Sequence, residues 1–118
     1  MNFNNLDWHD SVMKKIIIDR DTPGINDHIQ IDIIWPNETD SIIIFKDVYW
    51  ADFNMNFGIV STENILKAHS EGRDNEVVKD IYLKWKGYID NIDLNYYEIN
   101  LNSTSSRIRI VSREFVLI

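Results

Sequence analysis

The chain has 118 residues, a formal net charge of −7 at neutral pH, 44% hydrophobic residues and no cysteine. This length and apolar content predict one domain, spanning residues 1–118, with a core of its own. The acidic balance argues against nucleic acid or an anionic membrane as a partner, because attraction to phosphate needs clustered Lys and Arg. The absence of Cys excludes disulfides, thiol chemistry and Cys-bound metal centres, and we expect no cofactor.

The first twenty residues contain acidic side chains and only a three-residue apolar run, Ile16 to Ile18. A secretory signal peptide instead has a basic start and a longer apolar middle. The longest aliphatic and aromatic run, Ile42 to Phe45, is far shorter than the ~20 residues of a membrane span. We therefore predict a cytoplasmic protein.

The first half of the chain favours β-structure, because Ile, Val and aromatic residues form short runs between turn residues. Pro23 and Gly24 suit a type II turn, and Pro36 begins a second turn. Beyond them, Phe53 and Ile59 belong to an alternating apolar series, which indicates one buried face. The predicted strands cover residues 11–20, 27–35, 40–48 and 53–60.

The middle of the chain changes to helical spacing. Ser61 or Thr62 can cap a short helix that ends near Gly72. A second helix is predicted over residues 75–86, with Asp74 or Asn75 as its N-cap. Ile81, Leu83 and Trp85 also alternate with polar neighbours, so a strand over the same residues stays open.

The last third of the chain predicts a hairpin. Tyr97, Ile99 and Leu101 share one face, and Ile108 and Ile110 return on it after a turn at 102–106.

Pairing Asn102 with Arg107 in this hairpin would place Glu98 diagonally from Arg109, within reach of an ion pair. The apolar positions change parity near Ser112, which indicates a β-bulge around residues 112–114.

Together these elements predict an α+β fold, with a mostly antiparallel sheet of about six strands and one or two helices inserted between strands four and five. Continuous apolar runs at 16–18, 33–35 and 42–45 break the alternation expected of a sheet with one wet face. We expect these strands to be covered on both sides, either by the helices or by a second copy of the chain in a homodimer.

Three patterns suggest where function could lie, and the first is His9 followed by Asp10. An imidazole beside a carboxylate can transfer protons or bind a divalent metal, as in a metal-dependent hydrolase. Adjacent residues of a strand point to opposite faces, however, and His28 and His69 lie in other predicted elements. The alternative is that Asp10 and Ser11 bond the backbone and Trp8 packs in the core, with no catalytic residue and no metal site.

The second pattern is aromatic. Trp35, Trp50 and Trp85, with Tyr49 and Tyr82, could line a concave site for a small ligand. The alternative is that these side chains form the core.

The third pattern is the distribution of charge. Residues 1–60 hold ten acidic and four basic residues, against nine and eight in residues 61–118. We predict that Asp40, Asp47 and Asp52 form an acidic surface that binds a partner, anchored by the aromatic Trp50. The alternative is a solvated edge that keeps the protein soluble.

Two segments carry a family resemblance: His9-Asp10-Ser11 before a predicted strand, and Asn102 to Ser106 running into residues 107–112. They resemble segments of small cytosolic bacterial immunity proteins of polymorphic-toxin systems. The resemblance implies a non-enzymatic inhibitor that docks on a toxin, and no site residue transfers with it. Sequence analysis thus predicts an acidic binding protein with a basic protein partner, with a small-ligand carrier and a metal-dependent hydrolase as alternatives.

Overall fold

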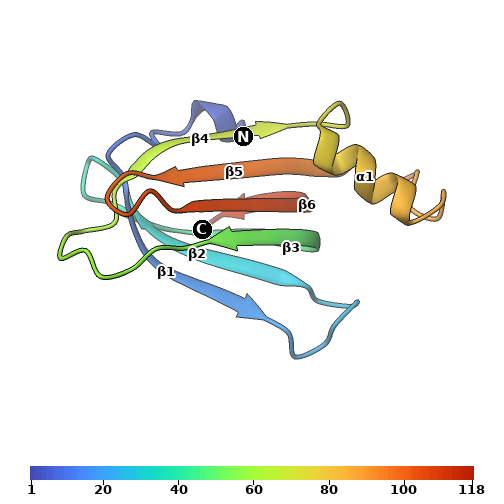
Figure 1. Cartoon of the computed structure of the whole chain (residues 1–118), viewed down its shortest axis with the longest axis horizontal. Helices are drawn as coiled ribbons and strands as arrows, with labels where there is room; N and C mark the ends of the chain where they lie inside the picture. Colours follow the sequence, from blue (N-terminus) through green and yellow to red (C-terminus); the bar gives the residue numbers. More distant parts are fainter.

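The computed structural model describes all 118 residues and contains a six-stranded antiparallel sheet and one α-helix (Figure 1). The strands lie side by side in the order β1-β2-β3-β6-β5-β4. A 3-10 turn, Phe3–Asn5, precedes the sheet, and the helix α1, Glu76–Lys84, lies between β4 and β5. The strands are β1 (Val12–Asp19), β2 (His28–Ile34), β3 (Asp40–Asn54), β4 (Ile65–Glu71), β5 (Asn95–Leu101) and β6 (Arg107–Leu117).

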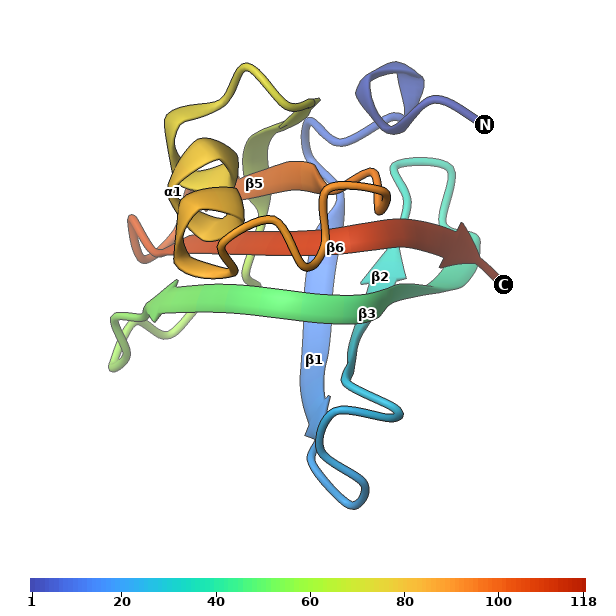
Figure 2. The same cartoon turned by 90° about the vertical axis from the view of Figure 1, so that its right-hand side faces the viewer.

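The sheet curls until its two edge strands meet at their starting ends. Ile65 N donates to Ser11 O at 2.7 Å, and Asp10 N and Met13 N donate to backbone oxygens of residues 65 and 63. Figure 2 shows that β1 and β2 consequently run across β3 and β6. The curled sheet encloses one core, which includes Phe3, Trp8 and Phe45.

Strands β3 and β6 change direction together at one corner. Phe45 and Val48 both pack against the enclosed core although they are three residues apart, which strict alternation forbids. Asp47, between them, has a positive φ of 54°. Opposite it in β6, the contributors to the core change from Ile110 to Phe115. The β-bulge expected around residues 112–114 lies instead in β3, where the register with β6 shifts between Val48 and Trp50.

The helix forms because its first turn is capped. Asn75 Oδ1 accepts hydrogen bonds from Val77 N at 2.8 Å and Val78 N at 3.2 Å, which satisfies two backbone donors that have no partner within the helix. Val78 and Ile81 then pack on the outer face of β5 and β6 against a second, smaller core. The helix predicted over residues 75–86 is confirmed.

Two predicted elements between residues 53 and 72 are wrong. There is no helix after Ser61 or Thr62, because residues 65–71 form strand β4. This segment bonds to β5 and meets the start of β1, and these backbone pairings outweigh the helical spacing of its side chains.

The separate strand predicted at 53–60 is wrong as well. Strand β3 instead continues from Asp40 to Asn54, because its second half pairs with β6. The chain then leaves the sheet, and Phe57 and Ile59, expected on a buried face, are 83% and 56% exposed. Gly58, with a φ of 93°, lies between them.

The last hairpin forms, but its register is shifted by two residues from the predicted one. Asn100 lies opposite Arg107, so Glu98 lies directly opposite Arg109 and not diagonally from it. The Glu98–Arg109 ion pair does not form, because the guanidinium of Arg109 binds Asp52 in β3.

The exposed edge of β4 is covered by the 3-10 turn. The Asn4 side chain accepts a hydrogen bond from Ser70 N at 2.7 Å and donates one to Ser70 O at 3.3 Å. The amide group of Asn4 therefore bonds β4 as a neighbouring strand would.

None of the helices is both long enough and apolar enough to cross a membrane.

We expect Asn75→Ala to lower the free energy of unfolding by about 1 kcal/mol, because two backbone N–H groups lose their acceptor. Urea denaturation followed by circular dichroism measures the change. Asn75→Asp, which keeps the acceptor, is the matched control and should cost much less. Equal losses in the two variants would contradict the assigned cap.

Candidate functional site

The candidate site lies where β2 separates from β3. Paired residues of these strands end at Ile29 and Phe45, and one further bond joins Val48 N to Asp27 O at 2.9 Å. Beyond that bond, residues 49–54 of β3 pair with β6 on one side, while their other edge has no strand beside it. Figure 2 shows the β1–β2 hairpin projecting beyond β3, away from β6.

Two adjoining hollows occupy this divergence, with volumes of about 320 and 270 Å³. They share Asp27, Val48 and Tyr49, and we call them together the hairpin groove. Most residues of the first hollow are apolar, and the others are charged or polar. It is lined by Ile18, Asp19, Arg20, Asp27, His28, Ile29, Val48, Tyr49, Trp50, Ala51 and Phe53. The second is lined by Gly24, Ile25, Asp27, Asp47, Val48, Tyr49, Trp85, Ile92 and Arg113.

Aromatic side chains stand along the hairpin groove. The rings of Tyr49 and Trp85 meet edge to face, with centroids 5.5 Å apart. The guanidinium of Arg109 lies 5.1 Å from the centre of the Trp50 ring, within the range of a cation–π contact. Trp85 is 45% exposed, so part of its ring is open to a partner.

Arg109 is itself held by Asp52. Its Nε and Nη2 atoms donate to Asp52 Oδ2 at 3.1 and 2.6 Å. This hydrogen bonding raises the pKa of Arg109 although partial burial opposes the charge. Asp52 therefore orients the guanidinium that packs on Trp50. The same guanidinium neutralises the charge of the Asp52 carboxylate.

Arg109 also belongs to a row of polar residues that crosses four neighbouring strands. The members of this row, in order across the sheet, are Asp52, Arg109, Glu98 and His69. Glu98 accepts hydrogen bonds from the Tyr96 hydroxyl and from Asn100 Nδ2.

Burial alone would raise the pKa of Glu98, but these bonds and the charges of His69 and Arg107 outweigh it and lower the pKa. Burial and Glu98 raise the pKa of Tyr96 to about 12. Glu98 is thus held as a carboxylate and Tyr96 as a hydrogen-bond donor.

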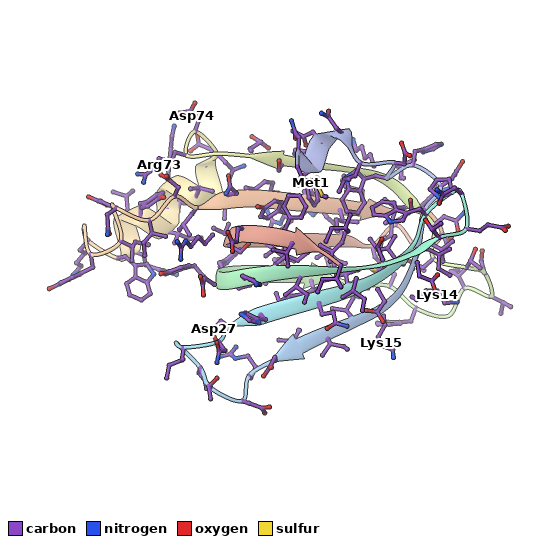
Figure 3. The ribbon with its side chains drawn as sticks, turned by 180° about the vertical axis from the view of Figure 1, so that it is seen from behind. Met1, Lys14, Lys15, Asp27, Arg73 and Asp74 are labelled. Atoms are coloured by element: carbon purple, nitrogen blue, oxygen red, sulfur yellow. The ribbon has the colours of Figure 1, made fainter.

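The hairpin beside the groove carries acids that no cation pairs. Asp19, Asp21 and Asp27 form no ion pair, and Arg20 is the one base between them. Two of these carboxylates accept backbone hydrogen bonds, Asp19 from residue 21 and Asp27 from Gly24, which fixes their positions. Figure 3 shows Asp27 where the hairpin turn enters β2.

The four residues predicted to bind a partner do not form one surface. Trp50 and Asp47 line the groove, and Asp47 lies 3.6 Å from Arg113. Asp52 is joined to the groove only through Arg109. Asp40 stands at the start of β3, opposite Ile34 and beyond the hairpin turn at Pro36, because β3 is long enough to separate its acids.

The prediction that three tryptophans line one concave site is wrong for Trp35. Trp35 lies at the other end of the fold, 5.3 Å from Trp8 between ring centres, and donates to Ser41 Oγ at 2.7 Å. Trp50 and Trp85 do lie on the groove, whereas Tyr82 belongs to α1 and packs against the second core.

His9 and Asp10 approach each other because the chain turns before β1. Asp10 has a φ of 66°, and its carboxylate lies 3.5 Å from His9 Nε2. Both side chains are mostly exposed, and no group of three or more His, Asp or Glu residues is placed to hold a metal. As the alternative interpretation predicts, Trp8 is buried and Ser11 Oγ donates to Asp7 O at 2.6 Å, but the Asp10 carboxylate lies beside His9 and does not bond the backbone.

Sequence reasoning missed the part played by Arg109 and Tyr96. The sequence pattern that could have revealed them is the alternation of polar residues on β5 and β6, which places Tyr96, Glu98 and Arg109 on the outer face. A scan of the sequence against models of protein families gives no match, and a comparison with curated proteins gives none.

We expect Tyr96→Phe to raise the pKa of Glu98, because the carboxylate loses a donor that favours its charged form. The folded-state pKa of Glu98 is depressed, so the stability that it contributes is present above its ordinary pKa and is lost as pH falls through the folded value. In the variant, the folded pKa moves toward the ordinary one and this contribution shrinks.

Carbon-13 NMR titration of the Glu98 carboxyl measures the shift. Tyr88→Phe is the control, since Tyr88 is 85% exposed and contacts no part of this row. An unchanged Glu98 titration in Tyr96→Phe would remove the tyrosine hydroxyl as a cause.

Proposed function

We propose that this chain is a non-enzymatic binding protein that takes an extended basic segment of a partner protein in the hairpin groove. The free edge of β3 at residues 49–54 carries the proposal, because it offers backbone donors and acceptors beside a hollow lined mostly by apolar residues. A partner segment can add to such an edge as a further strand.

The chemistry of the groove favours a basic segment over an acidic one. Asp19 and Asp27, which help to line it, have no paired cation, and they are held by backbone hydrogen bonds. Lys and Arg have aliphatic stems that suit the apolar lining residues, and their charged ends reach carboxylates or aromatic faces. Tyr49 and Trp85 supply such faces at the second hollow.

The length of the groove favours a protein segment over a small ligand. Each hollow lies at or below the lower end of the volumes typical of ligand pockets. The two adjoin along one side of β3, which suits successive residues of an extended chain. A partner held this way would be covered by the acidic hairpin, as an immunity-type inhibitor would cover the basic site of a toxin.

The four tryptophan indole N–H signals in NMR report on this proposal. We expect a peptide of alternating Arg and Val to shift the signals of Trp50 and Trp85, and to leave those of Trp8 and Trp35 at the other end of the fold unchanged. A peptide of alternating Glu and Val, of equal length, is the matched control. Equal shifts from both peptides, or shifts at Trp8 and Trp35 alone, would contradict the proposal.

Removing charge from the hairpin groove should weaken this binding. In Asp19→Asn with Asp27→Asn, the new side chains still accept the backbone hydrogen bonds, so the local structure is kept and two charges are lost. We expect the peptide affinity to fall several-fold at low salt, by an amount that shrinks as salt is added. Isothermal titration calorimetry measures it.

The matched control is Asp74→Asn with Asp80→Asn, which removes the same charge from exposed positions before and on α1. An equal loss of affinity in that variant would show that only the net charge matters.

A further inference from the structure

The outer face of β1, β2, β3 and the end of β6 combines aliphatic and polar side chains, and neither core covers it. The aliphatic side chains on it that belong to neither core include Ile17, Ile34, Ile42, Ile44 and Val116. They alternate along their strands with inward residues such as Ile31, Ile33 and Ile43, which are completely or almost completely buried. The only α-helix covers β5 and β6 elsewhere, against Tyr96 and Val111.

Strand pairing fixes where these side chains stand relative to one another. Ile17, Gln30, Ile44 and Val116 form one row across four strands. Lys15, Asp32 and Ile42 form the next row on the same face. Between the two rows runs a line of inward-facing residues, namely Ile16, Ile31, Ile43 and Leu117.

We propose that this face binds a second copy of the same chain, through a two-fold axis that lies across the strands along the line of Ile31 and Ile43. Rotation about this axis exchanges the two rows. Ile42 then meets Ile44 of the partner subunit, and Asp32 meets Gln30 of the partner subunit. The same rotation brings Asp40, at one end of β3, to Lys46 of the partner subunit.

The charges on this face support a second copy over a basic partner. The face carries Lys15 and Lys46 as well as Asp32, Asp40 and Glu114, so it is nearly neutral in a strongly acidic protein. None of these five side chains forms an ion pair within the chain. Opposite charges that exchange under one two-fold axis make a self-complementary patch, as an isologous dimer requires.

The area of this face limits the expected affinity of the dimer. Four strands about 4.8 Å apart, each with three or four outward residues, give a patch smaller than the ~800 Å² that each partner buries in a standard interface. We therefore expect a dimer that forms at micromolar protein concentrations and strengthens with added salt, because salt screens the repulsion between two acidic chains. The hairpin groove lies outside this patch, so the inference is independent of the proposed function.

Sedimentation velocity across a range of concentrations tests the dimer on the full chain. We expect Ile44→Asp to weaken dimerisation at least about tenfold, since it places two carboxylates at the centre of an apolar interface. Ile59→Asp is the matched control, because Ile59 is exposed and lies outside the face. A wild-type chain that stays monomeric up to near-millimolar concentration would overturn the inference.

A charge exchange tests the axis itself and leaves the apolar side chains intact. Asp40→Lys alone, or Lys46→Asp alone, should weaken the dimer several-fold by bringing like charges together. The double variant should restore the affinity of the wild-type chain. If the loss of dimer affinity in the double variant equals the product of the losses in the two single variants, Asp40 does not meet Lys46 of the partner subunit and the proposed axis is wrong.

Discussion

The fold depends on how much of β3 is paired with a strand on each of its two sides. From Asp40 to Phe45 the strand lies beside β2, and from Val48 to Asn54 it has β6 alone. The change takes place at Asp47, whose positive φ turns the chain while the core continues past it on both sides. Because β6 turns with β3, these two strands stay paired through the change of direction, and only β2 separates from β3. The hairpin groove and the free edge beside it follow from that release.

Charge follows the same division. Where β3 and β6 stay together, Asp52 is neutralised by Arg109, and the row continues through Glu98 to His69. Where β2 departs, Asp19 and Asp27 keep carboxylates without a paired cation. The projecting hairpin is therefore one of the parts of the molecule where carboxylates have no partner of opposite charge, and the hairpin groove lies beside it.

Alternation and turn residues predicted the first two strands, the start of the third, the last hairpin without its register, and a helix in the region of α1, because each depends on neighbours close in sequence. They failed between residues 53 and 72, where Ile65 forms its contacts with Ser11 and Leu101. No local pattern encodes such distant partners. Trp50 and Asp47, predicted from aromatic content and charge distribution, both line the hairpin groove, yet Asp40 was grouped with them because a sequence does not show how far apart a long strand holds its residues. The bond from Arg109 to Asp52 was missed for the same reason.

The amide of Asn4 occupies both bonding positions at Ser70, so β4 presents no free ladder at that point. A sheet with two open margins can polymerise, each molecule extending the next without limit. With one margin blocked by a side chain, growth through edge pairing is limited on that side. A single asparagine near the start of the chain thereby closes part of the β4 edge to the addition of another strand.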